Sequence, residues 1–351
     1  MKGLKDSDGV VAVTVVIVHY RTPDLLRECL ESIEPEARRS PIEVLVVDNA
    51  SEDEAAELIR QRFSWASLIR NSFNYGFAIA NNQGFRRARG RYVMPLNPDT
   101  ELLPGALPTL VAFMDENPTV GMAAPVTVEA DGSLLAPWHD LRPFDDLLLV
   151  RRIRPARRES VGPRPYEVPW LWGTGFFCRR SAVGEERLFS EETFLFAEEY
   201  ELCVRVKRNG FRLFVVPDAR IRHHVSMSFR RTPEPLRVAR RLATAALWRV
   251  RRRHFGTALA ALNQVMVLLD ATLMWLAVAL KGFLTGSRSD GRALSLMDYR
   301  ARIEGSLGVL LKGERFLRGA DEAAWSYFNR GERPPLPPVS ESASPTVVGK
   351  A

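Results

Sequence analysis

"AVTVVIVHY" (12–20), "PDLLRECLESIE" (23–34) and "IEVLVV" (42–47) follow one another near the start of this 351-residue chain. The first and third stretches are nearly continuous apolar runs, which is typical of strands buried on both faces. The stretch between them predicts a helix with Pro23 in its first turn, where proline is favoured. A strand, a helix and a second strand in this order indicate a parallel sheet covered by helices on both faces.

The same alternation continues to about residue 130. Ser51 and Glu54 have the spacing of a capping box, which predicts the start of the next helix. The further expected elements are helices at 51–63, 77–89 and 104–116 and strands at 66–70, 91–96, 121–126, 166–180 and 211–216. The fold class is therefore α/β, followed by a helical region at 229–330 and a disordered tail at 331–351.

Composition limits the classes of protein that this chain can represent. Hydrophobic residues make up 46% and charged residues 26%, an ordinary globular balance. Cys29, Cys178 and Cys203 have no paired spacing, which favours a reducing compartment over a disulfide framework or a cysteine-based zinc site. The apolar run near the N-terminus follows acidic residues and lacks a small-residue cleavage site, so it predicts a strand and not a signal peptide.

The net charge of +7 is concentrated in two arginine-rich stretches, 150–160 and 229–255. Such stretches bind nucleic acid, face an anionic membrane or are simply solvated. The apolar segment 262–284 follows, but its core from Val265 to Leu280 is shorter than the about 20 residues of a bilayer span and contains Asp270. A bilayer span stays an alternative, but we expect this segment rather to lie at a membrane interface or in a dimer contact. The sequence contains no nucleic-acid-binding motif, which favours lipid as the partner.

Polar residues follow three of the expected strands at the points where those strands end. They are His19-Tyr20-Arg21, Asp48-Asn49-Ala50-Ser51 and Asn97-Pro98-Asp99. Each group alone is also typical of an ordinary tight turn. The carboxyl ends of parallel strands share one edge of the sheet, however, so three such groups favour a binding site there. A glycine-rich phosphate loop is absent from the sequence, which argues against a Rossmann dehydrogenase.

One carboxylate in "FLFAEEYELCVRVKRNGF" (194–211) is predicted to face inward. On a helix, Glu199 shares a stripe with Leu202, Cys203 and Val206. A charge on an apolar stripe is costly unless it is paired or used, so Glu199 is a candidate for chemistry. The opposite face is expected to lie in water and holds Glu198, Glu201, Arg205 and Arg208.

Seven short motifs occur in the order seen in family 2 glycosyltransferases of the GT-A fold. They are "VVIVHYRTPDLLRECLESI", "VLVVDNAS", "NSFNYGFAIANNQGF", "LNPDT", "GTGFFCRR", "FLFAEEYELCVRVKRNGF" and "VPDARIRHHVSMS". They resemble most the rhamnosyltransferase-like branch, and the resemblance covers about residues 12–228. It implies a GT-A-type catalytic domain at 1–228, with a donor half at about 12–130 and an acceptor half at 165–228.

The resemblance implies roles for the residues at the strand ends. Tyr20 matches the position whose ring lies against the nucleotide base, and Asp48 the position that accepts a hydrogen bond from N3–H of a pyrimidine. An aspartate there suits uracil or thymine, whereas cytosine has no donor at N3. Asn97 is expected near the ribose or the metal. The loop that lines the donor pocket would contribute Asn74, Gly76 and Asn81.

The resemblance also implies a metal site and a general base. Asp99 would bind a divalent cation, Mn²⁺ or Mg²⁺, that bridges the two phosphates of the donor. His223 matches the histidine of that site, with His224 as the alternative. Glu199 matches the general base, although Glu-Glu replaces the usual Glu-Asp pair and leaves Glu198 as an alternative. Trp172 and Thr174 are expected to border the acceptor site.

These features predict a metal-dependent, inverting glycosyltransferase. The donor would be a UDP- or dTDP-sugar, with dTDP-rhamnose among the candidates, and the acceptor a hydroxyl of a glycan or polyprenyl-linked glycan of the cell envelope. The enzyme would be cytoplasmic and peripheral on the inner leaflet of the membrane. Two alternatives are an inactive glycan-binding relative, against which the acidic Asp99 and Glu199 argue, and a nucleotide-sugar pyrophosphorylase, which would need a glycine-rich basic loop after the first strand.

Overall fold

The computed structural model describes residues 11–129, 132–137, 161–171, 175–192, 194–224, 233–285 and 290–329. Several sequence predictions therefore concern residues outside these ranges. They are the arginine-rich stretch 150–160, the tail 331–351 and the expected acceptor-site residues Trp172 and Thr174.

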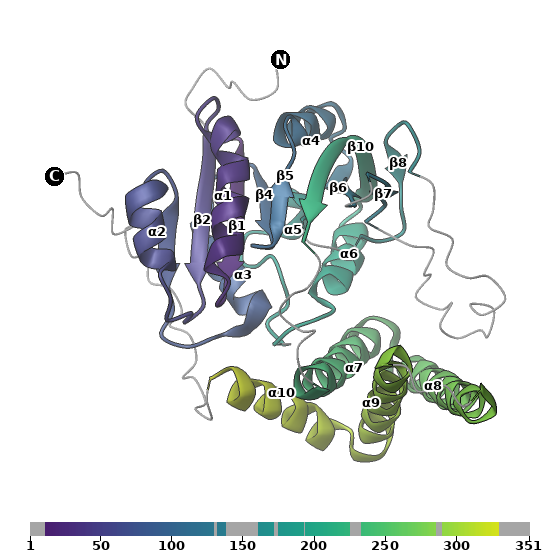
Figure 1. Cartoon of the computed structure of the whole chain (residues 1–351). Coiled ribbons are helices and arrows are strands. Elements are labelled where there is room, and N and C mark those ends of the chain that lie inside the picture. The colour runs from purple at the N-terminus through teal and green to yellow at the C-terminus, as the bar shows by residue number, and fades with distance from the viewer. Residues whose placement is uncertain are drawn as a thin grey trace.

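One mixed sheet organises the first two thirds of the chain (Figure 1). The central order is β3-β2-β1-β4-β9-β6-β10-β5, in which β3, β2, β1 and β4 run parallel and β9 and β5 run antiparallel to their neighbours. The short β7 pairs with β6, and β8 pairs with β10. The strands are β1 (Val13–His19), β2 (Ile42–Asp48), β3 (Ser67–Arg70), β4 (Tyr92–Leu96), β5 (Thr100–Leu102), β6 (Val120–Val128), β7 (Leu134–Leu135), β8 (Tyr166–Glu167), β9 (Phe177–Arg179) and β10 (Arg212–His223).

Helices cover both faces of this sheet, as the apolar strands predicted. One core cluster packs α1, α2 and α4 against the sheet, and the other packs α3, α5 and α6 against the opposite face. The predicted α/β class is therefore confirmed. The helices are α1 (Pro23–Ala37), α2 (Ala55–Arg62), α3 (Gly76–Arg87), α4 (Ala106–Glu116), α5 (Arg180–Val183) and α6 (Glu198–Arg208).

The predicted capping box at the start of α2 is wrong. Its N-cap position is Glu54, which makes no side-chain cap hydrogen bond. Ser51 is instead buried between strand ends, where its hydroxyl oxygen accepts the N–H of Arg21 at 3.1 Å. The Oδ1 atom of Asp53 accepts the N–H of Ala55 at 3.0 Å. The helix therefore begins with an aspartate interaction two residues upstream of its first residue.

Four long helices follow the sheet and form a separate layer beneath it as drawn, across the edge at which β1 and β2 end (Figure 1). They have apolar clusters of their own, which also include loop residues that precede α6. The predicted C-terminal helical region is therefore present. The helices are α7 (Pro233–Phe255), α8 (Thr257–Thr285), α9 (Asp290–Lys312) and α10 (Glu314–Phe328).

Candidate active site

The ends of β1 and β2 lie side by side, because His19 pairs with Asp48 in the parallel register. The Oδ1 atom of Asp48 accepts the N–H of Ser51 at 2.9 Å, and Arg70 Nε lies 3.9 Å from Oδ2. The Asp48 carboxylate therefore keeps acceptor capacity for a further donor at the sheet edge. The buried His19 contacts Asp53 at 2.9 Å, so His19 holds the loop that follows β2.

A network of amide groups shapes the loop that leads into α3. Asn49 Nδ2 donates to Asn74 Oδ1 at 2.8 Å, and the N–H of Gly76 donates to the same oxygen at 2.9 Å. Gly76 has a φ of 80°, and a Cβ there would lie 2.4 Å from the carbonyl oxygen of Phe194. Glycine is therefore required by both the backbone angle and the close approach. Asn74 and Gly76 thus order the loop predicted to line the donor pocket.

Asn81 of α3 differs from Asn74 because its side-chain oxygen is an unused hydrogen-bond acceptor. Its Nδ2 donates to the carbonyl of Phe77 at 2.9 Å. Its Oδ1 is buried and has no hydrogen-bond partner among the described residues. A buried amide oxygen without a partner is uncommon, so this atom is a candidate acceptor for a ligand.

Asp99 and His223 lie together, as predicted from residues more than a hundred positions apart. His223 Nε2 lies 3.2 Å from Asp99 Oδ1. Apart from that contact, Asp99 Oδ1 is buried without a hydrogen-bond partner in the described part of the chain. Asn97 lies at the start of the same turn, where its carbonyl accepts the N–H of Thr100 at 3.1 Å. A carboxylate and an imidazole in this arrangement suit Mn²⁺, with Mg²⁺ as the harder alternative.

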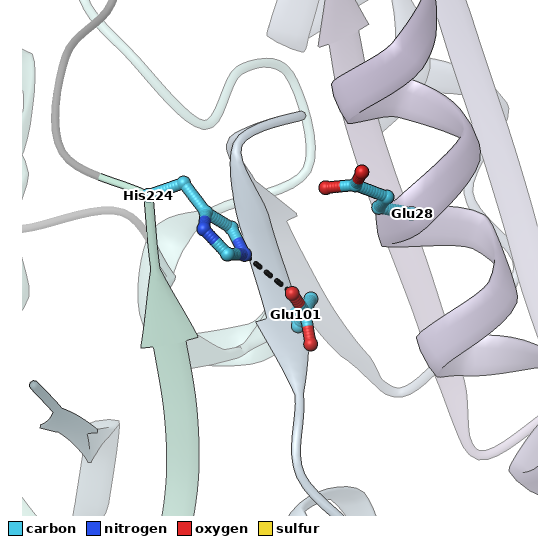
Figure 2. Close-up of side chains that lie close together, drawn as sticks. All are labelled: Glu28, Glu101 and His224. Carbon is cyan, nitrogen blue, oxygen red and sulfur yellow. Dashed lines mark hydrogen bonds and ion pairs between the residues drawn. The ribbon is translucent and has the colours of Figure 1, made fainter. Parts of the chain in front are cut away.

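His224, the alternative metal residue, belongs to a different group (Figure 2). Its Nε2 contacts Glu101, and Glu28 of α1 lies close to both. Its backbone N–H donates to the carbonyl of Asp99 at 2.9 Å. The two adjacent histidines therefore contact different carboxylates, which agrees with the alternation of side chains along a strand.

The segment before α6 has an unusual backbone. Phe196 and Ala197 both have positive φ, at 78° and 64°, although neither is glycine. Such conformations cost free energy and concentrate at functional sites. Glu198 and Glu199 follow directly at the first turn of the helix.

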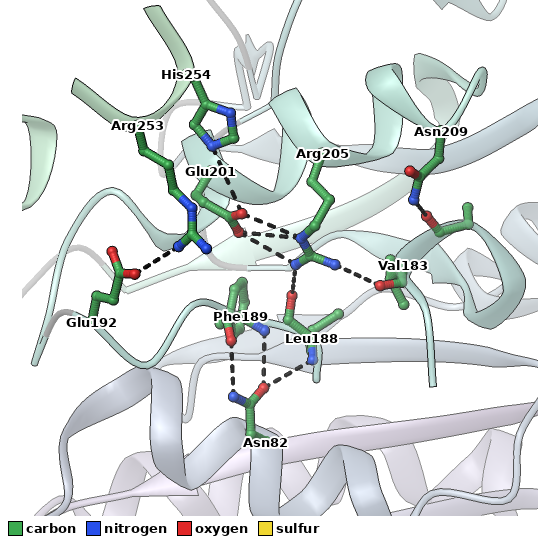
Figure 3. Close-up of polar contacts among 11 residues, drawn as sticks. Asn82, Val183, Leu188, Phe189, Glu192, Glu201, Arg205, Asn209, Arg253 and His254 are labelled. Carbon is green, nitrogen blue, oxygen red and sulfur yellow. Dashed lines mark hydrogen bonds and ion pairs between the residues drawn. The ribbon is translucent and has the colours of Figure 1, made fainter. Parts of the chain in front are cut away.

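The predicted orientation of the α6 glutamates needs correction. Glu198 and Glu201, expected in water, are 4% and 3% exposed, and Glu199 is only half-buried. Glu201 pairs with Arg205 at 3.3 Å and lies 3.9 Å from His254 (Figure 3). Glu198 lines a small cavity together with Arg249 and other residues of α7. The prediction treated α6 as an isolated helix, whereas α7 covers its outer face.

Burial changes the acidity of the glutamate pair. Burial, and then the neighbouring Glu199 charge, raise the pKa of Glu198 from 4.5 to about 8. Burial also raises the pKa of Glu199. Glu198 Oε1 has no hydrogen-bond partner among the described residues. Carboxyl groups with raised pKa can exchange protons near neutral pH, which is the property of a general base.

Asn82 is an important residue that the sequence analysis missed (Figure 3). Its Oδ1 accepts the N–H groups of Leu188 and Phe189, both at 2.9 Å. Its Nδ2 donates to the carbonyl of Phe189 at 2.9 Å and to Glu191 at 2.8 Å. The residue fastens α3 to the loop before α6. The motif "ANN" contains both Asn81 and Asn82, and nothing in the sequence indicates that Asn82 has this structural role.

Comparisons with known proteins show which chains and folds this protein resembles. Residues 14–186 match the family model for glycosyl transferase family 2. The N-acetylglucosaminyl-diphospho-decaprenol L-rhamnosyltransferase of Mycobacterium tuberculosis is 26% identical over 248 residues, which are 62% of this chain and 78% of that protein.

Two solved structures share the fold. A mannosyltransferase from Pyrobaculum calidifontis, in complex with GDP-Man and Mn²⁺, has a TM-score of 0.56 at 19% identity and covers 86% of this chain and 87% of its own. S. aureus TarS 1–349, in complex with UDP-GlcNAc, has a TM-score of 0.53 at 16% identity, with 90% and 91% covered. The predicted GT-A-type architecture is therefore confirmed.

Proposed function

We propose that this chain, which matches the family 2 glycosyltransferase model over residues 14–186 and is similar in sequence to a rhamnosyltransferase, is an inverting, metal-dependent enzyme of cell-envelope glycan synthesis. The observation that carries the proposal is the contact of His223 Nε2 with Asp99 Oδ1 at 3.2 Å, since apart from that contact this buried oxygen has no hydrogen-bond partner among the described residues. Residues 1–228 are proposed as the catalytic domain.

The proposed donor is a UDP- or dTDP-sugar. Asp48 would accept N3–H of uracil or thymine, and the ring of Tyr20 would lie against the base. Asn97 would lie near the ribose or the metal, and the loop with Asn74, Gly76 and Asn81 would line the donor pocket. The rhamnosyl transfer named for the mycobacterial relative makes dTDP-rhamnose the first donor to test.

Asp99 and His223 would hold the metal, which neutralises the charge of the leaving nucleoside diphosphate. Glu199 would take the proton of the acceptor hydroxyl. The hydroxyl oxygen then forms a bond to the anomeric carbon as the bond to the diphosphate oxygen breaks. Attack opposite the leaving group inverts the configuration at that carbon. The proton moves to Glu199, and the electron pair of the broken bond moves to the nucleoside diphosphate.

The proposed acceptor is a polyprenyl-diphosphate-linked sugar, as in the name of the mycobacterial relative. Such a substrate lies at a membrane. The segment Thr257–Lys281 is long and apolar enough to cross a bilayer, and only 17% of its most apolar window is buried. We assign residues 229–330 to docking on the cytoplasmic leaflet, with α8 in the interface.

The arginines of α7 contribute less to that docking than their number indicates. Four of them contact carboxylates of the protein itself. The pairs are Arg240 with Asp298, Arg249 with Asp321, Arg252 with Glu314, and Arg253 with Glu192. Arginines in such pairs fasten α7 to its neighbours, so the apolar face of α8 becomes the main contact with lipid.

A thermal-shift panel tests the proposed donor site. UDP, dTDP, GDP and CMP are each added with Mn²⁺, with Mg²⁺ or with EDTA. A ligand at 100 times its Kd stabilises the folded state by about 2.7 kcal/mol. We expect UDP and dTDP with metal to raise the melting temperature most. Equal shifts for all bases, or equal shifts in EDTA, would contradict the proposed site.

A further inference from the structure

The last residue of α10, Phe328, and the next residue, Asn329, contact two residues of the proposed donor pocket. Asn329 Oδ1 accepts the N–H of Asn74 at 2.7 Å, and its Nδ2 donates to the Asn74 carbonyl at 3.1 Å. The hydroxyl of Tyr20 donates to the carbonyl of Phe328 at 3.0 Å. Three hydrogen bonds therefore join the end of α10 to residues more than 250 positions earlier in the chain.

The ring of Phe328 adds an aromatic contact on each side. It meets the Tyr20 ring edge-on with centroids 5.9 Å apart. It also stacks on Phe194 with centroids 5.0 Å apart and an interplanar angle of 19°. Phe194 begins the loop that leads to Glu198 and Glu199, and its carbonyl accepts the N–H of Phe77 at 3.0 Å. The end of α10 thus contacts the donor half and the loop before α6 at once.

The hydrogen bonds of Asn329 satisfy both backbone groups of a buried residue. Asn74 is 5% exposed, and its side-chain oxygen is already used by Asn49 and Gly76. A buried backbone N–H or C=O without a partner is costly, so Asn329 completes the loop that the amide network shapes. This role requires the loop and α10 to be present together.

We propose that Phe328 and Asn329 are positioning residues of the donor-nucleotide site. They hold the Tyr20 hydroxyl and the Asn74 backbone so that the wall against the base is formed before the nucleotide arrives. The inference rests on the proposed function. It also makes donor binding depend on the helical region, because α10 is part of that region. A preorganised wall strengthens binding by removing an ordering cost.

These contacts indicate that the end of α10 positions the wall of the pocket and does not block the pocket. They engage a hydroxyl at the rim of the Tyr20 ring and the backbone of Asn74. The Asp48 carboxylate contacts Ser51 and Arg70, neither of which belongs to α10. The acceptor that would read the base is therefore left available by α10.

The test compares Asn329→Ala with Ser326→Ala in the full-length chain. Asn329→Ala removes both hydrogen bonds to Asn74, whereas Ser326 is exposed on α10, three residues earlier in the chain, and serves as the matched control. Isothermal titration calorimetry gives the Kd of UDP and of dTDP with Mn²⁺, and of inorganic pyrophosphate with Mn²⁺. We expect Asn329→Ala to weaken both nucleotides roughly tenfold, as for the loss of one or two hydrogen bonds, and to leave pyrophosphate unchanged. Ser326→Ala should match the wild type.

Phe328→Leu provides a second variant that keeps the backbone carbonyl for Tyr20. It removes the ring contacts with Tyr20 and Phe194 and should weaken UDP and dTDP by about threefold, a loss typical of one aromatic pair. The melting temperature of each variant is measured alongside. A lower melting temperature with an unchanged nucleotide Kd would overturn the inference, because it would show a purely structural contact.

The remaining outcomes separate this inference from the proposed function. Wild-type Kd values for UDP and dTDP in both variants overturn the inference and leave the donor site intact. Tighter binding by Asn329→Ala overturns it in favour of an obstructing segment. An equal loss of pyrophosphate overturns it in favour of a defect that is not confined to the base. If the wild-type protein binds no nucleoside diphosphate, both the inference and the proposed function fail.

Discussion

Glu198 and Glu199 are adjacent in sequence, yet the fold places them in different surroundings. Glu198 lines the cavity between α6 and α7, with Arg249 and Arg253 among its neighbours. Glu199 is half-buried and does not line that cavity. The resemblance assigns the general base to Glu199, and the structure supplies a separate reason for the choice: Glu198 faces the helical layer. Their different surroundings allow separate tests of each carboxylate.

Turnover should distinguish the two glutamates. Glu199→Gln keeps the shape but removes the base, so we expect turnover to fall by about 10² to 10⁴ with donor affinity unchanged. Glu198→Gln should lower turnover by less than about tenfold, because a group facing α7 does not reach the acceptor. Activity is measured with a lipid-linked acceptor, and the Kd of UDP is measured on each variant. Normal turnover in Glu199→Gln, with a loss in Glu198→Gln, would transfer the role of base to Glu198.

The raised pKa of Glu198 predicts a pH-dependent stability. The folded state holds the proton up to about pH 8, whereas the unfolded state releases it near 4.5. The wild type therefore loses this contribution to the free energy of unfolding as the pH rises from about 4.5 to about 8. Glu198→Gln stays neutral, so its stability relative to the wild type should increase over that range.

Urea unfolding at several pH values between 4.5 and 8.5 measures this difference. Glu192→Gln is the control, because Glu192 is exposed and pairs with Arg253 at the rim of the same cavity. The stability of Glu192→Gln relative to the wild type should not show the increase with pH that is expected for Glu198→Gln. The charged groups around Glu198 are Glu192, Glu199, Glu201, Arg249 and Arg253. A difference between wild type and Glu198→Gln that is constant with pH would show that Glu198 does not titrate in this window.

The two adjacent histidines at the end of β10 should differ in their effect on the metal. His223 contacts Asp99, whereas His224 contacts Glu101. We expect Asp99→Asn to abolish the Mn²⁺-dependent thermal shift with UDP and His223→Ala to reduce it strongly. His224→Ala should retain it. Loss of the shift in His224→Ala alone would indicate that the metal binds instead to Glu28, Glu101 and His224.

At the scale of the elements, Asn82 predicts a large effect on stability. It satisfies the N–H groups of Leu188 and Phe189 and the carbonyl of Phe189. Asn82→Leu has a similar volume but leaves these groups without partners, each at about 1 to 3 kcal/mol. We expect the free energy of unfolding to fall by about 3 kcal/mol or more.

Asn209→Ala is the control and should cost about 1 kcal/mol or less, since Asn209 donates one hydrogen bond from an exposed position. Equal losses in the two variants would show that the loop before α6 relaxes around the missing amide.

Local patterns were sufficient for the elements of the sheet and insufficient for the contacts between distant elements. The apolar run at 12–20 contains β1, and the polar groups after β1 and β2 do share one edge. The orientation of α6 was wrong because its outer face is covered by α7, which periodicity within one helix cannot indicate. The contact of Tyr20 with Phe328 spans 308 positions and has no local signature.

The site residues also divide into those that the sequence could identify and those that it could not. Asp99 and His223 could be paired from their motifs, because the resemblance covers both. Asn82 could not be distinguished from Asn81 in "ANN", since their different roles depend on which one faces the loop at 188–191. Motifs identify the residue types that a reaction needs, whereas tertiary packing decides which of two neighbouring residues of the same type has a given role.

At the scale of the whole molecule, α8 exposes an apolar stripe to its surroundings. Leu269, Leu276 and Leu280 are each more than half exposed, and the stripe recurs every three or four residues. Its exposed members are Leu262, Val265, Leu269, Leu273, Leu276 and Leu280, with Trp275 beside them. The described arginines of α7 that contact Asp298, Asp321, Glu314 and Glu192 are held within the protein. Contact with lipid should therefore be mainly apolar.

Sedimentation with anionic vesicles tests this arrangement, because apolar contacts resist salt and charge contacts do not. We expect the wild type to sediment with the vesicles at both low and high salt. Each leucine withdrawn from water contributes about 1.5 to 3 kcal/mol, so Leu269→Glu with Leu276→Glu should lower partitioning by ~100-fold or more. Leu311→Glu, at a highly exposed position on α9, is the matched control and should still sediment. If the wild type stays in the supernatant and sedimentation equilibrium shows a dimer that the double variant dissociates, the stripe joins two copies of the chain, and the acceptor is delivered without docking through α8.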